Sequence, residues 1–184
     1  MDQNITLELI INFLLETPMF EELNAGELSQ IVHIMQMQRF REGQPVFSEG
    51  DHGDAWYVLF DGEARVTKST PFGPEREVAT LEAHACFGEM AILDGSARSA
   101  TVSSIGECTL FRFPRLPFLQ LMEEGNLGAF KLVHGMARVL CQRQRYLTTQ
   151  LSELMEELEE LEDDAKPALT RDLGDLLDRY TLSE

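Results

Sequence analysis

Cysteine is scarce in this 184-residue sequence, and long apolar runs are missing. Cys86, Cys108 and Cys141 show no CxxC spacing and are odd in number, so they support neither a disulfide framework nor a structural zinc site. No apolar run reaches the roughly 18 residues that a membrane-spanning helix needs. The N-terminus also lacks the basic start of a signal peptide. We therefore predict a protein of a reducing compartment, the cytoplasm, with no membrane segment.

Basic residues are also few, with 15 Lys and Arg against 32 Asp and Glu and a net charge of −17. Nucleic acids and anionic membranes are both bound through clustered Lys and Arg, so this composition predicts contact with neither. The charge is uneven, because residues 1–149 carry 20 acidic and 12 basic side chains while residues 150–184 carry 12 and 3. The last fifth of the chain therefore holds half of the net charge and should be solvated.

Motifs for catalysis and for metal binding are missing as well. The sequence has no Gly-x-Ser-x-Gly, P-loop or Cys–His arrangement. Its four histidines lie in separate segments without ligand spacing. The Asp-His-Gly-Asp stretch at 51–54 is typical of a turn rather than of a metal site. We therefore predict no enzyme activity, no metal and no cofactor.

What is present is a core-forming pattern that changes along the chain, with 43% apolar residues overall. Residues 5–36 show helical spacing with a stop at Pro18 and a restart near Asn24. From Met37 the chain turns to short alternating runs separated by glycines. At least seven short strands are predicted, at 39–41, 45–47, 56–60, 64–67, 77–81, 100–102 and 109–113. This pattern predicts an α+β fold with an antiparallel, jelly-roll-like β-roll, flanked by N-terminal helices and a long C-terminal helix.

The strongest periodic signal follows this region. Nine residues recur at a 4-3-4-3 spacing, and we call them the seam: Val133, Ala137, Leu140, Gln144, Leu147, Leu151, Leu154, Leu158 and Leu161. This heptad pattern is typical of a coiled coil, in which one polar core residue can fix register. The alternative is one amphipathic helix packed on its own domain. We predict a long dimerisation helix over 131–165, following a roll domain over 1–130.

The last segment, 166–184, is predicted to be an acidic tail. Acidic side chains near the C-terminus of the long helix oppose the helix dipole, so this end should fray. Pro167 should then end the helix. Thr170 could then cap a short amphipathic helix at 171–180. Such a helix is too short to be stable alone, so it would pack back or dock on a partner.

The stretch from Phe87 to Val102 carries the functional signal. Gly88 allows close approach of the backbone to a ligand, and residues 89–93 have room for one helical turn whose free N–H groups suit an anion. Arg98 is placed to return toward that turn, and an Arg fork fits a phosphate. Glu89 suits a sugar hydroxyl better than a phosphate. The alternative for these two side chains is a buried Glu89–Arg98 ion pair.

This stretch resembles the phosphate-binding cassette of the cyclic-nucleotide-binding domain family. The family pattern is Phe-Gly-Glu, a short helix, then Arg, a small residue and Ala-Thr/Ala-Val. The sequence keeps it at Phe87, Gly88, Glu89, Arg98, Ala100 and Val102. Upstream, Phe40-x-x-Gly43, Phe47-x-x-Gly50 and Tyr57-x-x-x-x-Gly62 also follow the family's roll pattern. The resemblance covers about residues 10–145.

The resemblance implies a site for a 3′,5′-cyclic nucleotide. Glu89 would accept a hydrogen bond from the ribose 2′-hydroxyl, and Arg98 would pair with the phosphate. The implied ligand-binding residues within the cassette are Phe87, Gly88, Glu89, Met90, Ala91, Arg98, Ser99 and Ala100. The C-terminal helix would cover the base, and the family's base-contacting positions correspond to Arg143 and Gln144. Gln144 could instead serve only to set dimer register, and Arg143 could simply be exposed.

The sequence says less about which nucleotide base is bound and which partner protein is contacted. Ser99 supplies a hydroxyl that favours guanine in some family members, but bacterial activators that bind cAMP carry serine there too. We predict cAMP, with cGMP as the alternative. Only about 20 residues follow the long helix, and this segment is acidic overall, so no DNA-binding helix-turn-helix is expected. The predicted protein is a free-standing homodimeric receptor that acts through an unknown effector protein; the alternative is a ligand-free adaptor that presents a coiled coil.

Overall fold

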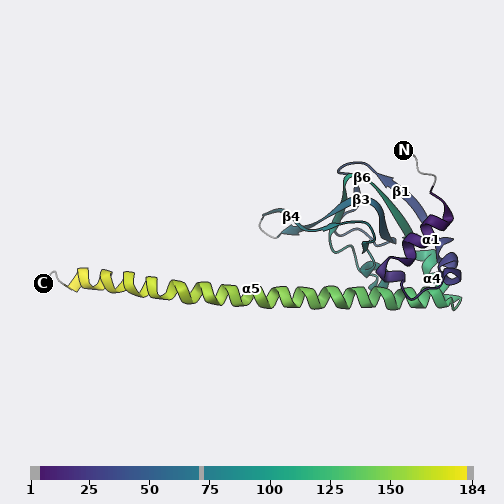
Figure 1. Cartoon of the computed structure of the whole chain (residues 1–184). Helices are drawn as coiled ribbons and strands as arrows, with labels where there is room; N and C mark the ends of the chain where they lie inside the picture. Colours follow the sequence, from purple (N-terminus) through teal and green to yellow (C-terminus); the bar gives the residue numbers. More distant parts are fainter. Residues whose placement is uncertain (1–4, 71–72, 182–184) are drawn as a thin grey trace. The chain divides into compact units, whose positions relative to one another are not determined.

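The computed structural model describes residues 5–70 and 73–181, with side chains as far as residue 158. It contains one six-stranded antiparallel sheet with helices before, within and after it (Figure 1). In chain order the elements are α1 (Leu7–Leu15), η1 (Pro18–Phe20), α2 (Ala25–Val32), β1 (Gln36–Phe40), β2 (Pro45–Phe47), β3 (Ala55–Thr70), β4 (Gly73–Leu81), β5 (Cys86–Phe87), α3 (Met90–Asp94), β6 (Thr101–Pro114), α4 (Arg115–Glu123) and α5 (Leu127–Thr181). The predicted α+β roll with flanking helices is confirmed.

Local capping signals explain where the N-terminal helices begin. The side chain of Thr6 accepts from the backbone N–H of Leu9 at the start of α1. At α2, Asn24 and Glu27 form a reciprocal capping box in which each side chain accepts from the other residue's N–H. These contacts confirm the predicted restart near Asn24.

The roll is built around two long strands rather than many short ones. β3 and β6 pair with each other over most of their length. β1 and β2 pair with opposite halves of β6. β5 and β4 pair with opposite halves of β3. The prediction of seven short strands is therefore wrong. The runs 56–60 and 64–67 form one strand, and so do 100–102 and 109–113.

The difference arises because β3 bends in its middle without ending there. Gly62 has a φ of +86° in the middle of β3, and the register against β6 shifts on both sides of Asp61. Such bulges turn a strand while its pairing continues on either side. The turn-like glycine therefore marks a corner of the roll rather than the end of a strand.

Side chains of β3 alternate between two buried clusters. Trp56 and Val58 belong to a cluster shared with the helices, whereas Tyr57 and Leu59 belong to a second cluster inside the roll. The ring of Trp56, the single tryptophan of the chain, stacks on Phe113 with 4.1 Å between ring centroids. The helices thus close one face of the sheet, and the roll encloses the other.

The C-terminal helix α5 is longer than predicted and belongs to two compact units, Met1–Val139 and Leu140–Glu184. In the first unit its Ala129, Leu132 and Met136 are buried in the helix-side cluster. Gly135 allows close packing there, because a Cβ at this position would lie 2.2 Å from the carbonyl oxygen of Met19. The side chain of Leu161 lies outside the description, as do the side chains of the tail.

The prediction that Pro167 ends the helix is wrong, because α5 continues to Thr181 and contains the segment 171–180. A proline keeps a φ that a helix accepts, and its cost of about 3 kcal/mol comes from one lost hydrogen bond and from crowding of the preceding turn. Helix-forming Ala and Leu residues on both sides of Pro167 act against that cost. Along the described part of the chain, no helix combines the length and apolar character needed to cross a bilayer.

Candidate cyclic-nucleotide site

The cassette joins the two halves of the sheet. Strand β5 leads through Gly88 to Glu89, which is the N-cap residue of the short helix α3. The helix ends at Gly95 in a left-handed conformation, with a φ of +72°, and the chain returns through Arg98 to the start of β6. The helical turn predicted at 89–93 is confirmed.

Gly88 is required by the packing of this loop. Its φ is +77°, a conformation that side chains disfavour. A Cβ on Gly88 would also lie 2.8 Å from Nη1 of Arg98. The glycine therefore makes room for the arginine of the cassette as well as for any ligand beside it.

Arg98 reaches back across the cassette, as the sequence predicted. Its guanidinium donates from Nη1 to the carbonyl oxygen of Gly88 at 2.9 Å and from Nη2 to that of Ala55 at 2.6 Å. The residue is only 3% exposed, and Nε has no hydrogen-bond partner among the described residues. A buried cation with a spare donor is costly unless an anion is bound, so this arrangement suits a phosphate.

Aromatic rings and burial set the electrostatics of Arg98. Its guanidinium carbon lies 4.1 Å from the centroid of the Phe47 ring and 5.8 Å from that of Tyr57. Burial lowers the pKa of the Arg98 guanidinium, while the nearby Tyr57 and Asp54 act in the opposite direction. An arginine keeps its charge under such shifts, so the site presents a permanent, poorly hydrated cation.

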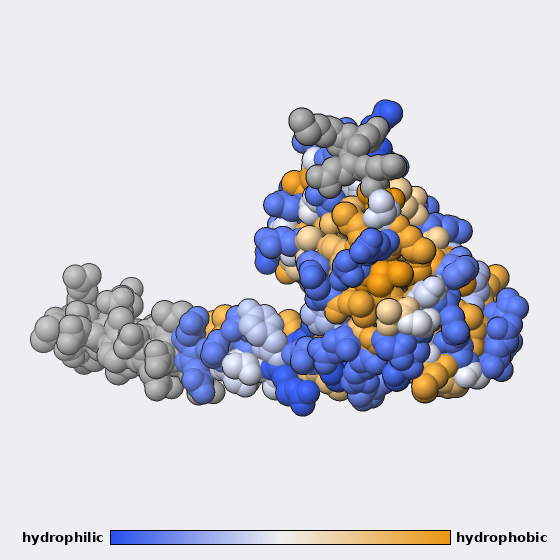
Figure 2. All heavy atoms as spheres, turned by 45° about the vertical axis from the view of Figure 1, so that its right-hand side comes forward, coloured by the Kyte–Doolittle hydropathy of each residue, from blue (hydrophilic) through white to orange (hydrophobic). Residues whose placement is uncertain are grey.

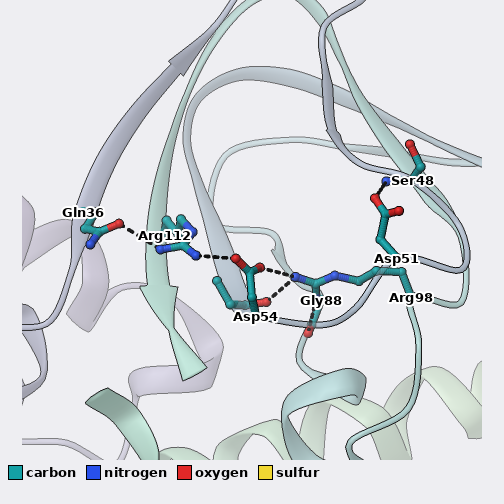
Figure 3. Close-up of polar contacts among 8 residues, drawn as sticks. Gln36, Ser48, Asp51, Asp54, Gly88, Arg98 and Arg112 are labelled. Carbon is teal, nitrogen blue, oxygen red and sulfur yellow. Dashed lines mark hydrogen bonds and ion pairs between the residues drawn. The ribbon is translucent and has the colours of Figure 1, made fainter. Parts of the chain in front are cut away.

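An acidic residue that sequence reasoning missed stands beside this cation. Asp54 lies with Oδ1 3.5 Å from Nη2 of Arg98, and its Oδ2 accepts from Nη2 of Arg112 at 2.6 Å. Arg112 in turn donates to the side chain of Gln36 at 2.8 Å. Figure 3 shows this chain of contacts from β1 across β6 to the cassette. Asp54 follows a turn signal in the sequence, and only the roll brings it to Arg98.

A cavity of about 520 Å³ lies beside this row of hydrogen-bonded side chains, on the side of β1 and β2. Asp54, Tyr57 and Arg112 belong to its lining, together with Gln38, Arg39, Phe40, Gln44 and Val46. Neither Glu89 nor Arg98 lines this cavity. The cavity is therefore separate from the cassette, and Asp54 contacts both, because it lines the cavity and lies 3.5 Å from Arg98.

The segment 51–54 is packed directly against the cassette. It follows a turn at 48–51, in which the backbone N–H of Asp51 donates to the carbonyl oxygen of Ser48 and the N–H of Ser48 donates to the Asp51 carboxylate. The turn therefore lies three residues before the predicted one, and His52 forms a β-bridge with Ala97. The N–H of Arg98 donates to the carbonyl oxygen of Asp51 at 2.9 Å. A Cβ on Gly53 would lie 2.2 Å from the Cβ of Ala91. This segment thus contacts both α3 and Arg98.

A second contact holds the far end of the cassette. Lys68 of β3 donates to the carbonyl oxygen of Ser99 at 2.5 Å and forms an ion pair with Glu49. The hydrogen bond from Lys68, with one from the backbone N–H of Ser69, lowers the pKa of Glu49 to about 2. This contact tethers Ser99, the residue after Arg98, to the roll.

The structure brings eight of the predicted ligand residues together in the cassette, and these residues differ in their exposure to solvent. Glu89 is 1% exposed, so this carboxylate is held inside the cassette beside the buried Phe87 and Ala91. Met90 and Ser99 are exposed, and Gly88 and Ala100 are half-buried. Arg98 donates to the carbonyl oxygen of Gly88, the residue before Glu89, so one cassette holds a buried carboxylate and a buried guanidinium. Such a pair of groups can bind a ligand that has both a hydroxyl and a phosphate.

The other two predicted ligand residues lie elsewhere. Arg143 and Gln144 are exposed on α5 in the second unit. Their contact with a nucleotide base stays a prediction. Among the described residues, no group of three or more His, Cys, Asp and Glu could hold a metal ion.

Comparison with known proteins places this geometry in a family. Residues 37–125 match the sequence model of the "Cyclic nucleotide-binding domain" family. This segment belongs to that family. The cyclic nucleotide-binding domain so identified includes the roll, the whole cassette and α4.

Individual relatives agree with this assignment. A cAMP-dependent protein kinase regulatory subunit of Mycosarcoma maydis is 35% identical over 94 residues, 51% of this chain and 18% of that protein. The cyclic AMP receptor protein of Thermus thermophilus is 31% identical over 129 residues, 70% of this chain and 58% of that protein. The crystal structure of the Thermus thermophilus catabolite activator protein superposes with a TM-score of 0.66 and 29% identity, over 74% of this chain and 62% of that one.

The similarity covers only part of each of these relatives. The chain spans less than a fifth of the kinase regulatory subunit and somewhat more than half of the receptor protein. The activities of the whole relatives are therefore not assigned to this chain on the basis of the shared domain.

Proposed function

We propose that this protein is a cyclic-nucleotide receptor that prefers cAMP to cGMP. The observation that carries the proposal is the pair of buried charged side chains, Glu89 and Arg98, held 1% and 3% exposed in one cassette. Burial of two charges is costly and does not by itself stabilise a fold, so their retention favours a ligand that uses them. Two of the relatives are named for cAMP, which supports adenine as the base.

The proposed roles follow from the chemistry of each group. Arg98 pairs with the cyclic phosphate, and Glu89 accepts a hydrogen bond from the ribose 2′-hydroxyl. Gly88 keeps the backbone close to both. Arg143 and Gln144 contact the base from α5. The proposed role is binding and regulation in the cytoplasm, not catalysis, and no cofactor takes part.

Isothermal titration of the purified, nucleotide-free protein with cAMP, and in parallel with cGMP, tests this function. Binding near micromolar establishes a receptor, and the ratio of the two dissociation constants identifies the preferred base. Absence of heat with both, on protein shown to be folded, rejects a receptor for cAMP or cGMP. The remaining alternatives would then be an adaptor that presents its helix α5 and a receptor for another cyclic nucleotide.

Glu89→Gln tests the sugar contact. The carboxylate accepts from a hydroxyl more strongly than an amide oxygen does, by about 1–2 kcal/mol. We expect the wild-type preference for cAMP over 2′-deoxy-cAMP to shrink about ten-fold in the variant. The measurement is the ratio of the two dissociation constants by calorimetry. An unchanged ratio would refute the proposed role of Glu89.

We further propose that the receptor is a homodimer through α5 and signals to an effector protein through this helix. Seam residues Leu147, Leu151, Leu154 and Leu158 are between 52% and 60% exposed, which leaves a row of leucines for a partner helix. The ligand would bias α5 between two arrangements, and a different affinity in each is what such a switch requires.

Truncation after Thr149 separates the roll from this helix. The first compact unit ends at Val139, so we expect the shortened protein to keep its fold and to bind cAMP within about three-fold of the full chain. Dimerisation should weaken strongly, because four seam leucines are removed. Circular dichroism, calorimetry and analytical ultracentrifugation measure the three properties. An unfolded or equally dimeric product would contradict the division.

A further inference from the structure

The segment that carries Arg98 lies just outside the pairing of the two long strands. The ladder between β3 and β6 ends at the pair of Thr67 with Thr101. Residues 98–100, which we call the return segment, directly precede β6. Segments beyond the end of a ladder open more readily than its centre does. The position of Arg98 therefore depends on contacts other than strand pairing.

The backbone of the turn at 48–51 holds the return segment from one side. The N–H of Gly50 donates to the carbonyl oxygen of Arg98, and the N–H of Arg98 donates to that of Asp51, both at 2.9 Å. The N–H of Glu49 donates to Oγ1 of Thr101, also at 2.9 Å. These hydrogen bonds join the turn to the return segment and to the start of β6, but they do not themselves reach β3.

Lys68 makes the connection to β3 through its side chain. Its ammonium group donates to the carbonyl oxygen of Ser99 at 2.5 Å and forms an ion pair with the carboxylate of Glu49. The other carboxylate oxygen of Glu49 accepts from the backbone N–H of Ser69 at 3.0 Å. One lysine–glutamate pair therefore links β3, the turn and the return segment beside Arg98. We call this pair, with its bonds to Ser99 and Ser69, the clamp.

Fold stability does not account for the clamp. Hydrophilic residues cover much of the face of the molecule shown in Figure 2, and a lysine on such a surface needs no functional explanation. The side chains of Lys68 and Glu49 are 48% and 25% exposed, and an ion pair as open as this contributes little to stability. The hydrogen bond from Lys68 is nevertheless the main cause that lowers the pKa of Glu49 to about 2, so the carboxylate stays charged in neutral solution.

We propose that Lys68 and Glu49 are positioning residues that hold Arg98 and Ser99 in place before a ligand arrives. This inference rests on the proposed cyclic-nucleotide receptor and concerns the preparation of its phosphate site. A site that is already ordered loses less conformational entropy when its ligand binds. Lys68 acts through Ser99, so the proposal needs no contact between the lysine and the nucleotide.

Calorimetry with cAMP on the full-length protein tests the effect on affinity. Lys68→Met removes the ammonium group, and we expect binding to weaken about ten-fold. Lys68→Arg keeps the charge and several donors and should stay within about three-fold of wild type. Glu49→Gln keeps an acceptor oxygen but not the charge, so a loss of about three-fold is expected.

Arg76→Met is the matched control for charge. Arg76 lies opposite Lys68 in the pairing of β4 with β3 and is exposed, so this variant removes the same charge from the same hairpin. Its affinity for cAMP should stay within about two-fold of wild type. Equal losses in Lys68→Met and Arg76→Met would show a general effect of charge on an anionic ligand and would overturn the proposal.

A second readout separates local positioning from loss of folded protein. In the Sp and Rp diastereomers of adenosine 3′,5′-cyclic phosphorothioate, sulfur replaces one or the other exocyclic oxygen of the phosphate. A smaller folded fraction weakens binding of both diastereomers by the same factor, whereas a displaced Arg98 changes its contact with one oxygen more than with the other. We expect the ratio of the two dissociation constants to change by about three-fold or more in Lys68→Met. An unchanged ratio would reject the positioning role.

Hydrogen exchange in the nucleotide-free protein tests the clamp without any ligand. The amide hydrogens of Gly50 and Arg98 bond the turn to the return segment, so they should exchange about ten-fold faster in Lys68→Met. The amide of Leu110, a buried residue of β6, should keep its wild-type rate. Unchanged exchange at Gly50 and Arg98 would contradict the proposal. If the wild-type protein binds neither cAMP nor cGMP, the proposed receptor fails, while the exchange rates still decide whether the clamp holds Arg98.

Discussion

Arg98→Leu is expected to weaken cAMP binding by about 30- to 3000-fold, or roughly 2–5 kcal/mol. The buried guanidinium is the cation proposed to meet the phosphate, and leucine leaves that anion without a partner. It also leaves the carbonyl oxygens of Gly88 and Ala55 without the donor that they now have. Isothermal titration calorimetry measures the loss directly.

Two companion variants make this result specific. Arg98→Lys keeps the charge but not the two-pronged geometry, so an intermediate loss is expected. Arg65→Leu removes an arginine whose exposed side chain pairs with Glu77, and its affinity should stay within about two-fold of wild type. Thermal melts without nucleotide check that each variant is folded. Near-normal affinity in a folded Arg98→Leu protein would reject the phosphate assignment.

Gly62→Ala is expected to destabilise the fold by about 3 kcal/mol. Part of this cost, about 1 kcal/mol, is the strain of a side chain at a φ of +86°. The rest is a clash, because a Cβ would lie 2.5 Å from the carbonyl oxygen of Glu107 and 2.7 Å from the Cβ of Cys108. For a protein of this size the melting temperature should fall by about 9 °C.

Gly43→Ala separates the two contributions. Gly43 has a φ of +70°, but a Cβ there would have no atom within 4 Å. Strain alone predicts a loss of about 1 kcal/mol at this position. Equal destabilisation of the two variants would show that the corner at Gly62 tolerates a side chain and that the clash contributes nothing.

The sequence was most informative where one local motif carried the signal. Glu89 and Arg98 lie nine residues apart, and a short helix with a glycine at each end is sufficient to bring them into one cassette. The capping residues of α2 were equally local. Such features could be predicted because their partners are close along the chain.

Features that depend on the folded roll could not be predicted in this way. Asp54 meets Arg98 and Arg112 only because β3 and β6 pair across more than forty residues of chain. Lys68 reaches Ser99 for the same reason. Gly62 looked like a turn because a corner within a strand and a loop between strands use the same residue. The predicted helix end at Pro167 was wrong because it used only the low helix propensity of proline and not the helix-forming residues on either side.

The position of Trp56 has a practical consequence. It is the single tryptophan, it is fully buried, and it stacks on Phe113 under the helices. Its neighbour in β3, Ala55, accepts the hydrogen bond from Arg98. Intrinsic fluorescence from one defined indole therefore reports from the residue next to this hydrogen-bond acceptor of Arg98. Nucleotide titrations and stopped-flow kinetics can follow that emission without any dye attached to the protein.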